Sequence, residues 1–220
     1  MRKITAVLLM IFLSETLAFA LEDKKVQPPK KIEYDGITLN YNPSWKDKEI
    51  YIEENLDRDP ENEIIIGFVA GHKEEKETKE LEDSKELFFK NLKDAEELPV
   101  IQNYAFYQIY DKKPNRYYEK IKTISGMDRL GSIEIIRLDP NESPAIFILS
   151  PGGERYLDLS IYQWRNGGYV LIFNKGTSGK IEYDSKQTPP VINIENKKEG
   201  WETFSWNTQK KVWQAQNIKL

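Results

Sequence analysis

Alternating apolar and polar positions predict that most of the chain from residue 32 onward forms β-strands. Residues 32–41 alternate on both sides of Asp35-Gly36, a dipeptide typical of a two-residue hairpin turn. Residues 64–69 are apolar throughout, which is the pattern of a strand buried on both faces. Short aromatic and β-branched segments follow residue 101, and turns rich in Gly, Pro and Asn separate them. The sequence therefore predicts a mainly β protein.

One segment breaks this pattern and predicts a helix. Lys, Glu and Asp dominate residues 73–98. Apolar residues recur there at helical spacing, at Leu81, Phe88, Leu92 and Ala95. We expect one inserted amphipathic helix over residues 78–96, ended by Pro99. Its charged side is interpreted as the solvent face of a helix that covers a sheet, and the alternative is a docking surface.

The N-terminal segment predicts export. Arg2 and Lys3 precede an apolar run over residues 4–13, and Ala18-Phe19-Ala20 follows as a small-x-small cleavage pattern. We expect a signal peptide over 1–20 that is cleaved after Ala20. The alternative is an uncleaved membrane anchor, but Glu15 interrupts the run well short of the ~20 apolar residues that a span needs.

The expected product is periplasmic or secreted, with no transmembrane segment after signal cleavage. Residues 21–31 are charged and contain Pro28-Pro29, a composition typical of a flexible tether. We expect residues 32–220 to form a single β-rich domain.

Composition excludes several functions. The chain has no Cys and one His, so it cannot form disulfides, a Cys-ligated zinc site or a site with two His ligands. Its 32 basic and 36 acidic residues give a net charge of −4, which argues against nucleic acid as a partner. An exported domain of this kind must therefore be stabilised by its core rather than by disulfides.

An internal repeat organises the strand-rich part of the chain. Residues 56–66, 138–148 and 183–193 align without gaps as an apolar or aromatic residue, an Asp, a polar turn and an apolar strand. Aromatic strands follow each of these segments. We expect three repeat units, at about 50–122, 133–174 and 179–216, of which the first is longer because it contains the helical insertion. Each unit would be a small antiparallel sheet that its neighbours cover.

These units resemble the FG-GAP/VCBS-type blades of integrin-alpha-like β-propellers over about half of the chain. In that family an acidic turn of the form D-x-D-x-D-G-x-x-E/D leads into a buried strand, a YxW-like aromatic strand follows, and the turn holds calcium. The resemblance implies blade-like antiparallel sheets. Because a closed propeller usually needs about four or more blades, we expect a small or incomplete propeller-like assembly.

The resemblance also implies one calcium site, in the first unit. Its four oxygen-donor positions are occupied by Asn55, Asp57, Asp59 and Glu63. Pro60 replaces the turn glycine of the family. In the second and third units, donor positions hold Arg137, Ala145, Lys186 and Pro190. We therefore expect those two loops to keep the turn but not the ion site. For the first loop, the alternative is a solvated acidic turn without an ion.

Trp164, Tyr169 and Trp206 are the candidate ligand-binding residues. Exposed aromatic rings would stack on a glycan or a peptide, whereas the equivalent positions of Trp164 and Trp206 in the repeat favour a place in the core. No catalytic constellation is recognisable: His72 has no partner His or Cys, and Ser150 lacks the glycines of a nucleophile elbow.

We therefore expect an exported, non-enzymatic binding or scaffold module of the envelope, with an envelope protein or a glycan as partner and calcium as a bound ion. The alternative is a secreted hydrolase that acts on carbohydrate through paired carboxylates.

Overall fold

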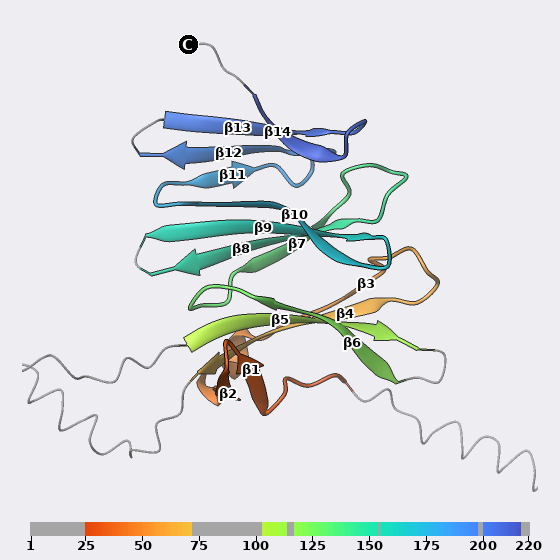
Figure 1. The fold of residues 1–220 in the computed structure, drawn as a ribbon, viewed down its shortest axis with the longest axis vertical. Helices are drawn as coiled ribbons and strands as arrows, with labels where there is room; N and C mark the ends of the chain where they lie inside the picture. The colour runs from red at the N-terminus through yellow and green to blue at the C-terminus, as the bar shows by residue number, and fades with distance from the viewer. Residues whose placement is uncertain (1–24, 72–102, 114–116, 154, 198–199, 217–220) are drawn as a thin grey trace, which may run out of the picture.

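The computed structural model describes residues 25–71, 103–113, 117–153, 155–197 and 200–216, which form three antiparallel sheets (Figure 1). The first sheet contains β1 (Lys31–Tyr34), β2 (Ile37–Tyr41), β3 (Ile50–Glu54), β4 (Glu63–Gly71), β5 (Asn103–Lys112) and β6 (Tyr118–Ser125), and a 3-10 helix, η1 (Pro43–Lys48), lies between β2 and β3. The second contains β7 (Ser132–Ile136), β8 (Ala145–Gly152), β9 (Tyr156–Arg165) and β10 (Gly168–Thr177). The third contains β11 (Ile181–Tyr183), β12 (Val191–Asn196), β13 (Gly200–Asn207) and β14 (Val212–Gln216). The prediction of a mainly β protein is confirmed.

The same strand order occurs in all three sheets. The strands β3–β6, β7–β10 and β11–β14 each pair with the next strand in the chain, so that every set is a four-stranded antiparallel meander. The sheets follow one another along the long axis of the molecule, from the first sheet at the bottom of Figure 1 to the third at the top. Each sheet therefore contacts mainly the sheet that precedes or follows it in the chain.

The hairpin predicted at Asp35-Gly36 is confirmed as β1–β2. Both turn residues have positive φ, 50° for Asp35 and 76° for Gly36, as a two-residue hairpin turn of this kind requires. The hairpin extends the first sheet, because β2 pairs with the end of β4. Val26 packs against the hairpin core and Lys31 already belongs to β1, so part of the segment predicted as a tether contacts the domain.

The middle sheet buries both of its faces. Successive side chains of a strand point to opposite faces, so in β8 Phe147 packs toward the third sheet while Ile146 and Ile148 pack toward the first. Both faces of β4 are buried as well, because Ile65 faces the second sheet and Ile64 faces the hairpin. The burial of residues 64–69 predicted from their apolar run is confirmed, and each such side chain contributes about 1.5–3 kcal/mol by leaving water.

The third sheet is apolar on one face only. Ile192 and Ile194 of β12 point into the core, whereas Asn193 between them is on the outer face and accepts a 2.9 Å hydrogen bond from the Thr203 hydroxyl. Trp201, which is 46% exposed, lies apart from this core. A polar outer face needs no further layer to cover it.

Two predicted elements lie outside the described residues: the signal peptide at 1–20 and the helix at 78–96. Within the part of the chain that the structure describes, no helix is long and apolar enough to cross a membrane.

Candidate functional site

The loop between β3 and β4 brings three carboxylates together. Asp57, Asp59 and Glu63 each offer an oxygen that lies within 4.8 Å of the others. They are three of the four residues that the sequence predicts as metal ligands. Oxygen atoms from several carboxylates, without His or Cys, are the donor set of a hard divalent cation such as calcium.

Local hydrogen bonds give the loop its shape. The Asp57 carboxylate accepts a 3.0 Å bond from the backbone N–H of Asp59, and the Asp59 carboxylate accepts a 2.9 Å bond from the N–H of Glu61. Such turns, in which an Asp side chain bonds to the backbone two residues later, are a common use of Asp in loops. Both side chains are thereby tied to the backbone of the loop.

Asn55, the fourth predicted ligand, stabilises the loop from its base. Its side-chain oxygen accepts a 2.9 Å hydrogen bond from the N–H of Arg58. Its side-chain nitrogen donates to the carbonyls of Asp59 and Glu61. The structure therefore gives Asn55 partners within the loop, and the close group of acidic oxygens consists of Asp57, Asp59 and Glu63.

Glu63 is the buried member of the group. One of its oxygens, Oε2, accepts a 2.5 Å hydrogen bond from the N–H of Leu56. The other, Oε1, is buried and has no hydrogen-bond partner among the described residues. Burial is the main cause that raises the pKa of Glu63 to about 7; the charges of Asp57 and Asp59 act in the same direction, and the hydrogen bond from Leu56 opposes them. A bound cation would supply the partner that this oxygen lacks, since unpaired buried charges are costly.

A fourth carboxylate, Asp111, adjoins the group and was missed by the sequence analysis. Ile64 pairs with Tyr110 in the antiparallel register of β4 and β5, which brings the next residue of β5, Asp111, close enough to Glu63 for its charge to act on it. Asp111 is buried; its Oδ2 forms a 2.5 Å ion pair with Lys113, and its Oδ1 has no described partner. The charge of Asp111 raises the pKa of both Glu63 and Asp57.

Tyr169 also reaches this group, from the second sheet. Burial raises its pKa, and the charges of Glu63, Asp57, Asp111 and Asp59 raise it further. Its hydroxyl is buried without a described partner. The residue was singled out in the sequence as a candidate ligand-binding aromatic, but its proximity to the acidic loop depends on how two sheets pack and could not be read from the sequence.

The two other loops of the repeat keep the same turn. The Asp139 carboxylate accepts a 2.7 Å hydrogen bond from the N–H of Asn141, and the Asp184 carboxylate accepts a 3.0 Å bond from the N–H of Lys186. These Asp residues align with Asp57 in the sequence. Among the described residues, however, a group of three metal-ligating side chains occurs only at the first loop.

The three aromatic candidates lie at two cross-strand pairs. Trp164 is opposite Tyr169 at the β9–β10 turn, and Trp206 is opposite Trp213 at the β13–β14 turn. Tyr169 is 5% exposed and Trp206 is 6% exposed, so their rings offer little surface to a ligand. Trp164 is half-buried and lines a surface cleft. A ligand-binding role for Trp164 stays a prediction.

Comparison with known proteins adds no assignment: no family model matches the chain, and neither a curated protein nor a solved structure gives a significant match.

Proposed function

We propose that the chain is an exported, non-enzymatic binding or scaffold module whose acidic loop between β3 and β4 binds one calcium ion. The observation that carries the proposal is the buried, unpartnered oxygen of Glu63 beside the carboxylates of Asp57 and Asp59. Three carboxylates within 4.8 Å repel one another unless a cation or protons neutralise them. An ion at this point would also join the first sheet to Tyr169 of the second.

The donor set favours calcium over other ions. Calcium takes about six to eight oxygens in flexible geometry, and carboxylates can give it one or two each. Backbone carbonyls and water would complete the set. Zinc and copper would prefer imidazole or thiolate ligands, which this loop does not contain.

The stacked sheets support a propeller-like repeat that stays open. The four-stranded meander recurs three times, and the residue before each aligned Asp packs into an apolar cluster: Leu56, Leu138 and Tyr183. Three units are fewer than closure around an axis usually needs, and the outer face of the third sheet is polar. We infer an open stack of degenerate blade-like units.

The alternative of a carbohydrate hydrolase has one point in its favour. A Glu with a pKa of about 7 beside other carboxylates has the protonation behaviour of a general acid. A general acid must, however, reach the substrate, and Glu63 is fully buried. Burial of this side chain therefore favours an ion-binding role over a catalytic one.

Calcium-dependent stability tests the proposal. We expect calcium to raise the melting temperature of residues 21–220 relative to chelator. The double variant D57N/D59N keeps side-chain oxygens for the turn but removes two charges, and we expect it to lose the response. The matched control D139N/D184N alters the equivalent residues of the other two loops and should respond like the parent. A parent protein without a calcium response would refute the ion site.

A further inference from the structure

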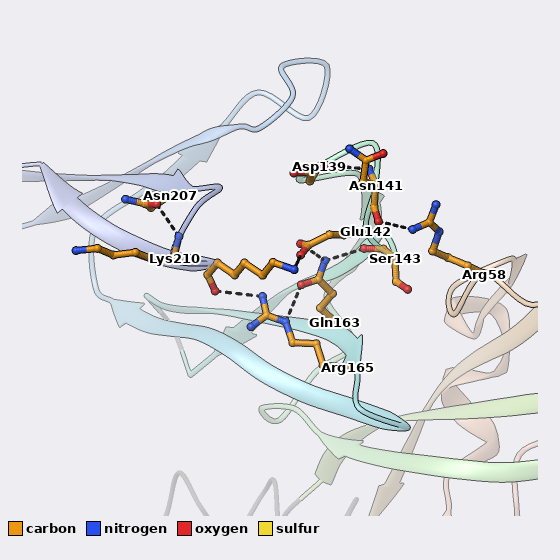
Figure 2. Close-up of polar contacts among 10 residues, drawn as sticks. Arg58, Asp139, Asn141, Glu142, Ser143, Gln163, Arg165, Asn207 and Lys210 are labelled. Carbon is orange, nitrogen blue, oxygen red and sulfur yellow. Dashed lines mark hydrogen bonds and ion pairs between the residues drawn. The ribbon is translucent and has the colours of Figure 1, made fainter.

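A cleft of about 510 Å³ opens where loops of all three sheets meet (Figure 2). Arg58 reaches it from the first sheet, and the turn before β8 and the β9–β10 turn contribute from the second. The third sheet contributes Lys210 and Lys211 from the β13–β14 turn. A volume in this range suits a small molecule or a short segment of a polymer.

The cleft is cationic although the chain is acidic overall. Its lining includes four basic side chains, Arg58, Arg165, Lys210 and Lys211, and one carboxylate, Glu142. Glu142 is already neutralised, because Lys211 forms a 2.5 Å ion pair with it. Three basic groups are left without a carboxylate partner in the lining, and a concave surface with one sign of charge attracts ligands of the opposite sign.

One arginine of the cleft lining, Arg165, is held in place. The Arg165 side chain donates from Nε to Gln163 at 2.9 Å and from Nη2 to the carbonyl of Lys211 at 3.2 Å, as Figure 2 shows. Its guanidinium also lies over the Trp206 ring, 5.5 Å from the centroid. Gln163 is itself fixed, since it is buried and donates a 2.7 Å bond to the carbonyl of Ser143.

This arrangement prepares Arg165 to bind an oxyanion. The described hydrogen bonds of the guanidinium leave Nη1 for a ligand. A fixed guanidinium loses little side-chain entropy on binding and can bond to both oxygens of a carboxylate. Arg58, from the loop of the first sheet, donates a hydrogen bond to the carbonyl of Asn141 (Figure 2).

The remaining lining suits the body of a sugar. Asn141 and Asn166 present exposed amides, which can donate to and accept from hydroxyl groups. The half-buried ring of Trp164 adds an apolar surface beside them. We propose that this cleft binds an acidic saccharide, with its carboxylate groups at Arg165, Arg58 and Lys210. The inference rests on the proposed binding function but does not require the calcium site.

Calorimetric titration of residues 21–220 with trigalacturonate tests the inference, in buffer freed of calcium so that calcium plays no part. We expect measurable binding that weakens as sodium chloride rises, because salt screens charge pairs. The fully methyl-esterified trisaccharide keeps the sugar body without its charges, and we expect it to bind at least about tenfold more weakly, as loss of a charge-assisted hydrogen bond predicts. Equal binding of the ester, or tighter binding of inorganic phosphate, would overturn the assignment.

Two double variants test whether the saccharide binds in the cleft. We expect R58Q/K210Q to weaken trigalacturonate binding at least about tenfold. The control K180Q/K186Q removes the same charge from exposed lysines that do not line the cleft, and it should bind like the parent. Melting temperatures of both variants establish that they fold. Equal affinity of the two variants would refute the cleft as the binding site.

The calcium-site variant D57N/D59N separates the two proposals. We expect it to bind trigalacturonate no more weakly than the parent does, whatever its response to calcium. A protein without a calcium response that still binds the acidic trisaccharide would refute the ion site and leave the saccharide site standing. Loss of saccharide binding in D57N/D59N but not in R58Q/K210Q would place the ligand at the acidic loop and overturn the inference.

Discussion

Glu63 and Leu56 close the acidic loop through a 2.5 Å hydrogen bond from the backbone N–H of Leu56 to the Glu63 carboxylate. Both residues are fully buried, so this contact fixes the start of β4 against the start of the loop. The second oxygen of the same carboxylate has no described partner. The loop is thus anchored by a carboxyl group that folding has taken out of water.

We expect Glu63→Gln to abolish the calcium response while it raises stability in chelator. Glutamine can still accept the Leu56 hydrogen bond, but it carries no charge next to Asp57 and Asp59, so repulsion in the ion-free protein falls. Thermal unfolding with calcium and with chelator measures both effects. Glu53→Gln, at an exposed position of β3, is the matched control and should change neither. A calcium response that survives in Glu63→Gln would contradict the assigned ligand.

In chelator we expect stability to decrease as the pH rises from about 4.5 to about 7. The pKa of Glu63 is about 7 in the folded protein and near its usual 4.5 when unfolded, so the folded state binds the extra proton throughout this window. Raising the pH removes that proton and leaves a buried charge, at a cost of roughly 3 kcal/mol. Melting temperatures between pH 4.5 and 7.5 measure the trend, and calcium should oppose it at the upper end.

The same pH series on Glu63→Gln is the control, because its side chain does not titrate. We expect the decrease to be smaller in this variant. If the stability of the variant falls with pH as much as that of the parent, groups other than Glu63 cause the decrease.

Phe147→Ala should destabilise the protein by roughly 3–5 kcal/mol, because Phe147 is fully buried between the second and third sheets. It contacts the rings of Tyr183 and Trp213, which belong to the third sheet. Trp201→Ala removes a larger side chain from the exposed outer region and should cost well under half as much. Denaturant unfolding measures both, and comparable losses would contradict the stacked core.

Glu142→Gln should increase the affinity for trigalacturonate several-fold. The change releases Lys211 from its 2.5 Å ion pair and removes the one carboxylate of the cleft lining. Glu202→Gln is the control, since Glu202 pairs with Lys175 at 3.5 Å and does not line the cleft. Calorimetric titration at constant ionic strength distinguishes them. Weaker binding by Glu142→Gln would show that the carboxylate contributes to ligand recognition.

Local pattern was enough to predict the elements that depend on neighbouring residues. The Asp35-Gly36 turn requires positive φ at two adjacent residues, and Asp-Gly is a dipeptide that favours this conformation. The burial of residues 64–69 follows from an uninterrupted apolar run. The grouping of Asp57, Asp59 and Glu63 was also predictable, because one short loop spans all three carboxylates.

Contacts between sheets were not predictable in the same way. Asp111 lies near Glu63 only through the register of β4 and β5, which are far apart in the sequence. Lys211 meets Glu142 because the third sheet stacks on the second. The local sequence around either residue gives no sign of this ion pair. The basic cleft is hidden for the same reason, since its cations come from three separate turns of an acidic chain.

By itself, the sequence determined the β class, the hairpin, the buried strand and the acidic loop, because period-two patterning and turn chemistry act over a few residues. The tertiary structure decided which charges meet. Stacking the three meanders buried one oxygen of Glu63 without a partner and gathered Arg58, Arg165 and Lys210 around one cleft. Those placements depend on strand register and sheet packing, which are set by the apolar cores between the sheets rather than by the charged residues themselves.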